Sequence, residues 1–354
     1  MNVLWISPGF AADENDSTCI PSLQLLALAL KTKEINLDIL TIGFPFTSTA
    51  YTWNTISVKS GYGANGKWLR WLNWIRVYQY GLKLHKEKNY DIIQSFWLGP
   101  AWLVGKWLSK KCQLPHITTL MGQDALKSNK YSILLTATDM TNIVAVSSFQ
   151  ANECYKAHKQ RPAKIIEWGI HPDELIINSN TERNIDIIGC GSLIKLKNWN
   201  LWVETVSGII DQNKSIKAII IGDGPEKSKI HNLILSLGKQ DNIKILESKP
   251  RKEVLNLMSQ AKILLHTASY ESYGFVLLEA YAMGCKIVST PVGIAEKLGR
   301  TGATKEELKL QLLKSLEMNL IKPVSAAPTI FDTADQYFDL YCNTIDLFKN
   351  KPIH

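Results

Sequence analysis

The sequence predicts an α/β protein built from two doubly wound, Rossmann-like domains. The chain has 354 residues, more than one typical hydrophobic core accommodates, so two domains are expected. A buried strand at 2–7, a helix at 21–33 and a strand at 37–42 form a βαβ unit, from which doubly wound sheets are built. Such sheets bind ligands at the carboxyl ends of their strands, so the loops at those ends are candidate sites.

The composition is that of a globular protein, with 45% hydrophobic and 20% charged residues. The net charge of +8 favours anionic partners such as nucleotide phosphates or anionic lipid headgroups. No nucleic-acid recognition module is present, so nucleic acid is not an expected partner. The longest apolar run, 95–108, is shorter than the about 20 residues that span a bilayer, and a strand starts directly after Met1. A cytoplasmic location is therefore expected.

The sequence gives no sign of a protein-held metal or cofactor. Its six cysteines are scattered without a C-x-x-C pair, and its seven histidines form no H-x-H or H-E-x-x-H cluster. The loop after the first strand lacks a G-x-G-x-x-G string, which argues against a nicotinamide dinucleotide site. We expect neither a metal nor a cofactor.

Two carboxylates mark the stretch 266–293. Glu271 lies in a polar loop, and Glu279 lies in an apolar helix at 276–283. Burying Glu279 among leucines and alanines is costly without a partner, so hydroxyl or cationic donors are expected beside it. The loop of Glu271 precedes a helix N-terminus, whose amides suit a sugar or phosphate oxygen. Spacing alone leaves open that Glu279 pairs with a Lys or Arg and that Glu271 is solvated.

A second candidate site follows the strand at 184–190. Gly191 and Ser192 form a turn there, Lys195 and Lys197 follow, and a helix begins at about Trp199. Backbone amides beside mobile ammonium groups suit a diphosphate. The alternative is that both lysines are surface residues of a βα loop.

The string HTASYESYGFVLLEAYAMGCKIVSTPVG at 266–293 resembles the donor-site signature of family 4 retaining glycosyltransferases of the GT-B fold. The strings GSLIKLKN at 191–198 and GDGP at 222–225 resemble further segments of that family. Two positions differ from its pattern. Ser192 stands where the family's G-R-L-x-x-x-K-G string has arginine, and Met121 stands where a histidine usually begins the string that ends at Asp124.

The resemblance implies two domains facing across a cleft, with a C-terminal helix that crosses back to the first. Residues 1–168 with 333–354 form the acceptor-side domain, and 169–332 the nucleotide-sugar domain. It implies transfer of a sugar, with retention, from a UDP- or GDP-sugar to a hydroxyl of a glycan or lipid-linked acceptor, in cell-surface polysaccharide or glycolipid synthesis. No divalent metal is required. The alternatives are a UDP-sugar epimerase of this architecture and a non-catalytic nucleotide-sugar-binding subunit.

The resemblance also implies roles for individual residues. Glu279 would accept hydrogen bonds from the ribose, Glu271 would hold sugar hydroxyls, and Lys197 would stabilise the departing diphosphate. The implied catalytic residues are Glu271, Lys197 and Asp124, and the implied cleft loop contains Gly9 and Phe10. The implied donor-binding residues are Gly191, Ser192, Lys195, Lys197, Glu271, Ser272, Tyr273, Gly274, Phe275 and Glu279.

The segment 67–88 alternates basic and aromatic residues at helical spacing. We expect an amphipathic helix that packs one stripe on the sheet. The alternative is an interfacial helix on an anionic membrane, which would make the protein peripheral on the inner face of the cytoplasmic membrane. The stripe consists of Trp68, Trp71, Leu72, Ile75 and Gln79.

Overall fold

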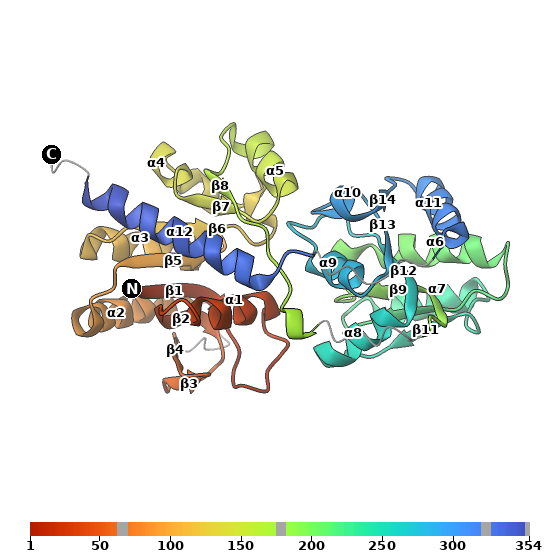
Figure 1. Cartoon of the computed structure of the whole chain (residues 1–354), viewed down its shortest axis with the longest axis horizontal. Coiled ribbons are helices and arrows are strands. Elements are labelled where there is room, and N and C mark those ends of the chain that lie inside the picture. The colour runs from red at the N-terminus through yellow and green to blue at the C-terminus, as the bar shows by residue number, and fades with distance from the viewer. Residues whose placement is uncertain (62–69, 175–181, 320–326, 351–354) are drawn as a thin grey trace. The chain divides into compact units, whose positions relative to one another are not determined.

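The computed structural model describes residues 1–61, 70–174, 182–319 and 327–350. The chain divides into two compact units, Met1–Gly169 with Pro328–His354, and Ile170–Ala327. Each unit contains one sheet with helices packed on it (Figure 1). The expected α/β class with two largely parallel sheets is confirmed.

The first unit has an eight-stranded sheet in the order β3-β4-β2-β1-β5-β6-β7-β8. Among the described strands of this sheet, only the pair β3 and β4 is antiparallel. The expected βαβ unit consists of β1 (Asn2–Gly9), α1 (Pro21–Lys31) and β2 (Asn36–Phe44). The other strands are β3 (Tyr51–Trp53), β4 (Ile56–Ser60), β5 (Ile92–Phe96), β6 (His116–Thr119), β7 (Ile143–Ala145) and β8 (Lys164–Ile165).

Helices α2 (Arg70–Lys88), α3 (Pro100–Cys112), α4 (Ala137–Met140), α5 (Ser148–His158) and α12 (Ile330–Lys349) complete this unit. The last of them, α12, packs against α1, as expected for a chain whose end returns to its first half (Figure 1). Tyr341 of α12 accepts a hydrogen bond from Trp5 Nε1 at 3.1 Å and donates one to Gln94. Tyr337 lies 2.9 Å from Thr119, hydroxyl to hydroxyl. These buried polar contacts fix α12 on strands β1, β5 and β6.

Helix α2 packs with a different stripe from the one that hydrophobicity indicates, so the prediction is wrong in this detail. Trp71 and Ile75 are exposed, whereas Val77 is fully buried and Gly81 faces α3. A Cβ atom at Gly81 would lie 2.5 Å from Leu108 Cδ1, so the missing side chain allows α2 to approach α3 closely. Close helix packing therefore outweighs the burial of Trp71. Trp68 lies outside the described residues.

The second unit has a six-stranded parallel sheet in the order β11-β10-β9-β12-β13-β14. Strand order runs outward from β9 through β10 to β11 and then resumes at β12, on the other side of β9. The sheet therefore has its topological switch point between β9 and β12. Its strands are β9 (Ile185–Cys190), β10 (Ala218–Ile221), β11 (Ile243–Leu246), β12 (Ala261–His266), β13 (Lys286–Ser289) and β14 (Arg300–Thr301).

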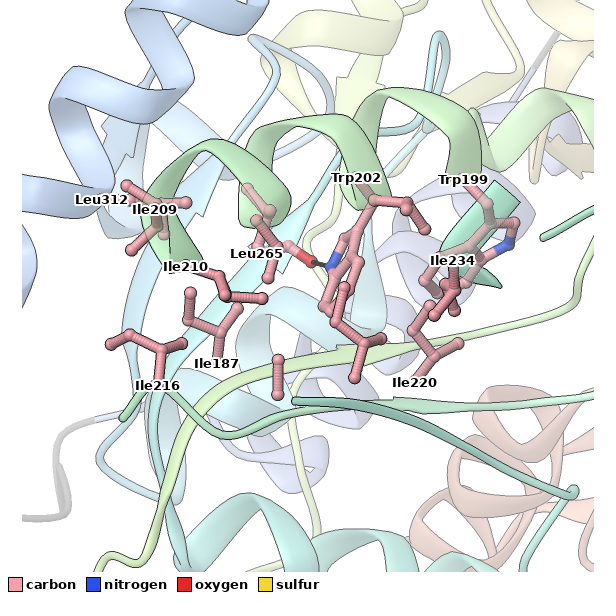
Figure 2. Packing of buried hydrophobic residues seen from close by; sticks show 14 of the residues in the cluster. Ile187, Trp199, Trp202, Ile209, Ile210, Ile216, Ile220, Ile234, Leu265 and Leu312 are labelled. Atoms are coloured by element: carbon pink, nitrogen blue, oxygen red, sulfur yellow. Dashed lines mark hydrogen bonds between the residues drawn. The ribbon is translucent and has the colours of Figure 1, made fainter. Parts of the chain in front are cut away.

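Helix α6 (Trp199–Ile210) covers the centre of this sheet (Figure 2). Its Trp202 is fully buried, and its indole Nε1 donates to the carbonyl of Leu265 at 3.1 Å. A Cβ atom at Gly189 would lie 2.6 Å from that nitrogen, so glycine in β9 makes room for the ring. The other helices are α7 (Lys227–Ser236), α8 (Arg251–Ser259), α9 (Phe275–Ala282), α10 (Ala295–Leu298) and α11 (Lys305–Glu317).

Candidate active site

The loops after β9 and β12 meet at the switch point of the second sheet. Open α/β sheets bind their ligands at this position, because the two loops there leave in opposite directions. The loop after β9 contains Gly191, Ser192 and the 3₁₀ helix η5 (Lys195–Lys197). The loop after β12 contains Glu271 and ends at Gly274, which caps α9 with a φ of 83°. The sequence-predicted donor residues thus come from two adjacent strand ends.

Hydrogen bonds hold these two loops together. Thr267 Oγ1 donates to the carbonyls of Lys197 and Asn198, each at 3.1 Å. Ser269 N donates to the carbonyl of Leu196 at 2.9 Å. The backbone of η5 is therefore anchored on the β12 loop, and Lys197 is directed towards Glu271.

Glu271 is the centre of a partly buried charge cluster. Its Oε1 atom forms an ion pair with Lys197 Nζ and lies 3.3 Å from His266 Nε2. Burial raises the pKa of this carboxyl, but His266 and Lys197 outweigh that effect and hold the pKa at about 2. Both contacts involve Oε1, and Oε2 has no hydrogen-bond partner in the described parts of the chain. A charged carboxylate thus keeps one oxygen available as an acceptor.

His266 is a member of this cluster that the sequence reasoning missed. Its side chain is only 5% exposed, and its Nε2 forms no hydrogen bond of standard geometry with the described residues. Burial lowers its pKa, although Glu271 opposes the shift, so the ring is neutral at pH 7. A histidine at the last position of a buried strand, five residues before the loop carboxylate, is the signal that could have indicated it.

Glu279 is buried in α9 and forms an ion pair with Arg251 Nη1. The opposite edge of the same guanidinium binds Glu174, with Nε to Oε1 at 2.8 Å and Nη2 to Oε2 at 2.9 Å. Burial disfavours the charged guanidinium, but the two carboxylates raise the pKa of Arg251 above its ordinary value. Glu279 therefore pairs with an arginine, which agrees both with the expected cationic donor and with the alternative that its spacing leaves open. The structure also contains Glu174, which the sequence reasoning did not identify.

The other candidate donor residues take different positions. Ser192 and Lys195 are exposed, whereas Ser272 and Tyr273 are buried. The Tyr273 carbonyl accepts from Ile294 N at 2.9 Å. The Phe275 ring lies 5.2 Å from the guanidinium carbon of Arg251. Gly191 adjoins Lys197, whose Nζ would lie 3.9 Å from a Cβ atom at that position.

The glycines of the GDGP turn pack against the loop after β9. A Cβ atom at Gly222 would lie 2.0 Å from the Gly191 carbonyl oxygen, and one at Gly224 would lie 2.6 Å from that of Leu193. Leu193 N also donates to the Asp223 carbonyl at 2.9 Å. The loop after β10 is therefore in close contact with the loop after β9.

The candidate residues of the first unit are Asp124, which is half-buried, and Gly9 and Phe10, which are buried. The Asp124 carboxylate accepts from Leu98 N at 2.8 Å and from Gly122 N at 2.7 Å, so it braces two strand-end loops. It also accepts from the backbone of Met121, the residue in place of the expected histidine. Phe10 is fully buried and packs edge-on against Trp53, and Gly9 ends β1. The ring of Phe10 thus belongs to the core of the first unit.

Cys190 lies at the end of β9, beside the charged groups of the site. Burial, with a smaller contribution from Glu279, raises the pKa of its thiol to about 12. The thiol is therefore protonated at neutral pH and is no nucleophile there.

In the described ranges, no group of three or more His, Cys, Asp and Glu side chains has an arrangement that could hold a metal ion.

Comparison with known proteins places residues 173–306 in the family "Glycosyl transferases group 1". An uncharacterised glycosyltransferase of Methanocaldococcus jannaschii is 25% identical over 271 residues, 74% of each chain. The N-acetyl-alpha-D-glucosaminyl L-malate synthase of Bacillus anthracis is 29% identical over 302 residues, 76% of this chain and 78% of its own.

Solved structures resemble the whole fold. The structure of Anabaena Alr3699/HepE in complex with UDP and glucose aligns with a TM-score of 0.62 over 99% of this chain and 98% of its own, at 16% identity. At 16% identity, this similarity shows that the two proteins share a fold. It includes both units and therefore extends beyond the 134 residues, 173–306, that match the family.

Proposed function

Since this chain is a glycosyltransferase of group 1 with the GT-B fold, we propose that it transfers a sugar, with retention, from a UDP- or GDP-sugar to a hydroxyl of a glycan or lipid-linked acceptor. The observation that carries this proposal is the meeting of Lys197 and Glu271 at the switch point of the second sheet. A cation for the diphosphate and an acceptor for sugar hydroxyls lie side by side there, on loops that hydrogen bonds hold in place.

Lys197 has the position of the group that stabilises the leaving diphosphate. Negative charge grows on the phosphate as the bond to the sugar breaks, and a preorganised cation stabilises that charge most strongly where water is excluded. Lys197 is 18% exposed and its backbone is anchored by Thr267. The departing phosphate would accept the acceptor's proton, so the proposed reaction needs no divalent metal. The exposed Lys195 is the candidate to supplement the charge missing at Ser192.

Glu271 would hold the sugar through its Oε2 atom. Its low pKa keeps the group ionised, and an ionised carboxylate accepts hydrogen bonds only. The contacts of Oε1 with Lys197 and His266 fix the carboxylate plane. The N-terminus of α9, directly after the loop, adds a positive dipole end beside the sugar.

Glu279 would bind the ribose in the same manner. Arg251 binds its Oε1 atom, and Oε2 has no hydrogen-bond partner among the residues described. A ribose has two vicinal hydroxyls that can donate to this oxygen. Burial raises the pKa of Glu279, and Arg251 opposes that shift because a nearby positive charge favours the charged form of the carboxyl group.

Two relatives support a donor of this class. The structure of the Anabaena protein is named as a complex with UDP and glucose, and the name of the Bacillus enzyme states an N-acetylglucosaminyl group joined to malate. We therefore rank a UDP-sugar first. The proposed setting is cell-surface polysaccharide or glycolipid synthesis in the cytoplasm, at the inner face of the cytoplasmic membrane.

The test measures donor binding first and transfer second. UDP, GDP and ADP are compared for their effect on the unfolding temperature, because a ligand at 100 times its Kd adds about 2.7 kcal/mol of stability. UDP-sugars are then incubated with lipid and glycan extracts, and the anomeric configuration of any product is determined by NMR. We expect stabilisation by UDP and an α-linked product from an α-linked donor. Free sugar without an acceptor would indicate the epimerase alternative, and binding without transfer the non-catalytic one.

A further inference from the structure

The first unit carries a surface that combines exposed apolar and basic side chains. Its apolar members are Trp71 and Ile75 of α2, Trp107 of α3, and Ile133 and Leu134 of the 3₁₀ helix η3 (Lys130–Leu134). Ile133 is 86% exposed and Trp71 53% exposed. Large apolar side chains at such exposure are unfavourable in water, and several of them on one face indicate a binding surface. We call these five residues, together with the exposed basic residues of the same three segments, the α2–α3–η3 surface.

Contacts between the three segments make the surface continuous. The rings of Trp74 and Tyr131 join α2 to η3 at a centroid distance of 6.5 Å. Those of Tyr78 and Trp107 join α2 to α3 at 6.3 Å. Lys106 of α3 donates to the Leu134 carbonyl at 3.4 Å. The exposed side chains therefore project from neighbouring segments of one packed layer.

The same three segments also carry exposed basic residues. Glu87 lies 3.8 Å from Lys83, and Asp139 forms an ion pair with Lys106 at 2.7 Å, so neither offers a large uncompensated negative charge. The exposed bases on the described parts of α2, α3 and η3 include Arg76, Lys83, Lys86, Lys110, Lys111 and Lys130, and also Lys88, which forms an ion pair with Asp38.

We propose that the α2–α3–η3 surface docks on an anionic lipid bilayer, with Trp71, Trp107, Ile133 and Leu134 inserted at headgroup depth. Tryptophan and isoleucine beside lysine match the layered chemistry of a bilayer surface, where apolar chains lie below phosphates. Lysine is depleted in the cores of protein–protein interfaces, which makes a protein partner the weaker fit. The proposal concerns attachment only and does not depend on the transfer reaction.

The experiment measures sedimentation of the full chain with vesicles of neutral phosphatidylcholine, with and without 25% phosphatidylglycerol. Two double variants separate the contribution of the apolar side chains to vesicle binding from that of the basic ones. Ile133→Ser/Leu134→Ser removes exposed apolar groups, and Lys110→Glu/Lys111→Glu reverses two charges. The matched controls lie on the second unit: Leu310→Ser, with exposure similar to that of Leu134, and Lys217→Glu/Lys305→Glu, with the same change of charge.

We expect the wild type to sediment with anionic vesicles and to be released by salt. The apolar double variant should bind at least about tenfold more weakly. The basic double variant should lose about fivefold for each lysine removed. The controls should bind like the wild type, and all variants should keep the wild-type unfolding temperature. Absence of wild-type binding, equal binding to neutral vesicles, or equal losses in the controls would each overturn the proposal.

Discussion

His266 Nε2 lies 3.3 Å from Glu271 Oε1, the same oxygen that forms an ion pair with Lys197. One buried carboxylate oxygen is thus adjacent to a neutral ring and a cation. Lys197 and Glu271 are 74 residues apart in the chain and meet because their loops leave adjacent strands. This arrangement places an ionised acceptor beside a cation at the switch point of the second sheet.

Replacing Lys197 with alanine should abolish most of the transfer activity. Loss of one preorganised charge at a developing anion costs about 3–4 kcal/mol, which corresponds to a kcat lower by about 10²–10³-fold. The protein should remain folded, because the cluster is small and the core around Trp202 is untouched. Steady-state kinetics and thermal unfolding measure the two effects. Lys217→Ala, an exposed lysine of the same unit, is the control, and wild-type kcat in Lys197→Ala would remove the assigned site.

The free energy of unfolding should fall at acidic pH because the pKa of Glu271 is low in the folded protein. Its pKa is about 2 in the folded protein and near 4.5 when unfolded, so the unfolded state binds more protons between these values. The contribution of the Glu271 ion pair to the free energy of unfolding is therefore complete above pH 4.5 and is lost as the pH falls towards 2. It amounts to about 3 kcal/mol at most.

Urea unfolding at several pH values compares the wild type with Glu271→Gln. The difference in their free energies of unfolding should be constant from pH 7 to 5 and should shrink below 4.5. His266→Leu should lower the free energy of unfolding by part of the amount lost in Glu271→Gln, because it removes one of the two partners of Oε1. A difference that does not change with pH would show that Glu271 has an ordinary pKa.

The sequence predicts both sheets and the two loops that meet at the switch point of the second sheet, because each signal is local. Alternating strands and helices indicate the architecture, and a glycine turn with lysines after a buried strand indicates an anion site. The residues that it missed act at long range. Arg251 binds Glu174 and Glu279 from 77 and 28 residues away, and an arginine at a helix start resembles any surface arginine in the sequence.

The orientation of α2 was unpredictable for a related reason. Hydrophobicity favours burying Trp71, but the face that is buried is chosen by Gly81 and its contact with Leu108 on another helix. Phe10 illustrates the reverse case. Its position after the first strand indicates a ligand loop, yet the edge of the sheet supplies Trp53 as a packing partner. In both cases a tertiary contact between distant segments determines which side chain is buried.

Gly222→Ala should weaken nucleotide binding through the loop after β9. A methyl group at this position would lie 2.0 Å from the Gly191 carbonyl oxygen. The methyl is fixed to the backbone and the carbonyl is part of it, so neither can rotate away. The loop after β9 must therefore shift, at a cost of about 2–3 kcal/mol. We expect a lower unfolding temperature and at least about tenfold weaker nucleotide binding by calorimetry. Gly99→Ala is the matched control, because nothing lies within 4 Å of its added methyl, and an equal effect there would refute the contact.

Removing Arg251 should destabilise the second unit more than removing Glu279. In Arg251→Met, Glu279 is left in the interior of α9 without its cation, which typically costs about 3–5 kcal/mol. In Glu279→Ala, Arg251 keeps both hydrogen bonds to Glu174, so the loss should be about 1–3 kcal/mol. Urea unfolding of both variants and of the double variant measures the order and the coupling between the two residues.

The two variants should also differ in ligand binding. Glu279→Ala lacks the oxygen assigned to the ribose, so it should bind the nucleoside diphosphate at least about tenfold more weakly while remaining folded. Glu174→Gln tests the outer half of the network and should affect stability less than Arg251→Met, because Glu174 is more exposed than Glu279. If Glu279→Ala were the less stable variant but bound nucleotide normally, Glu279 would be a structural residue only, and the ribose site would lie elsewhere.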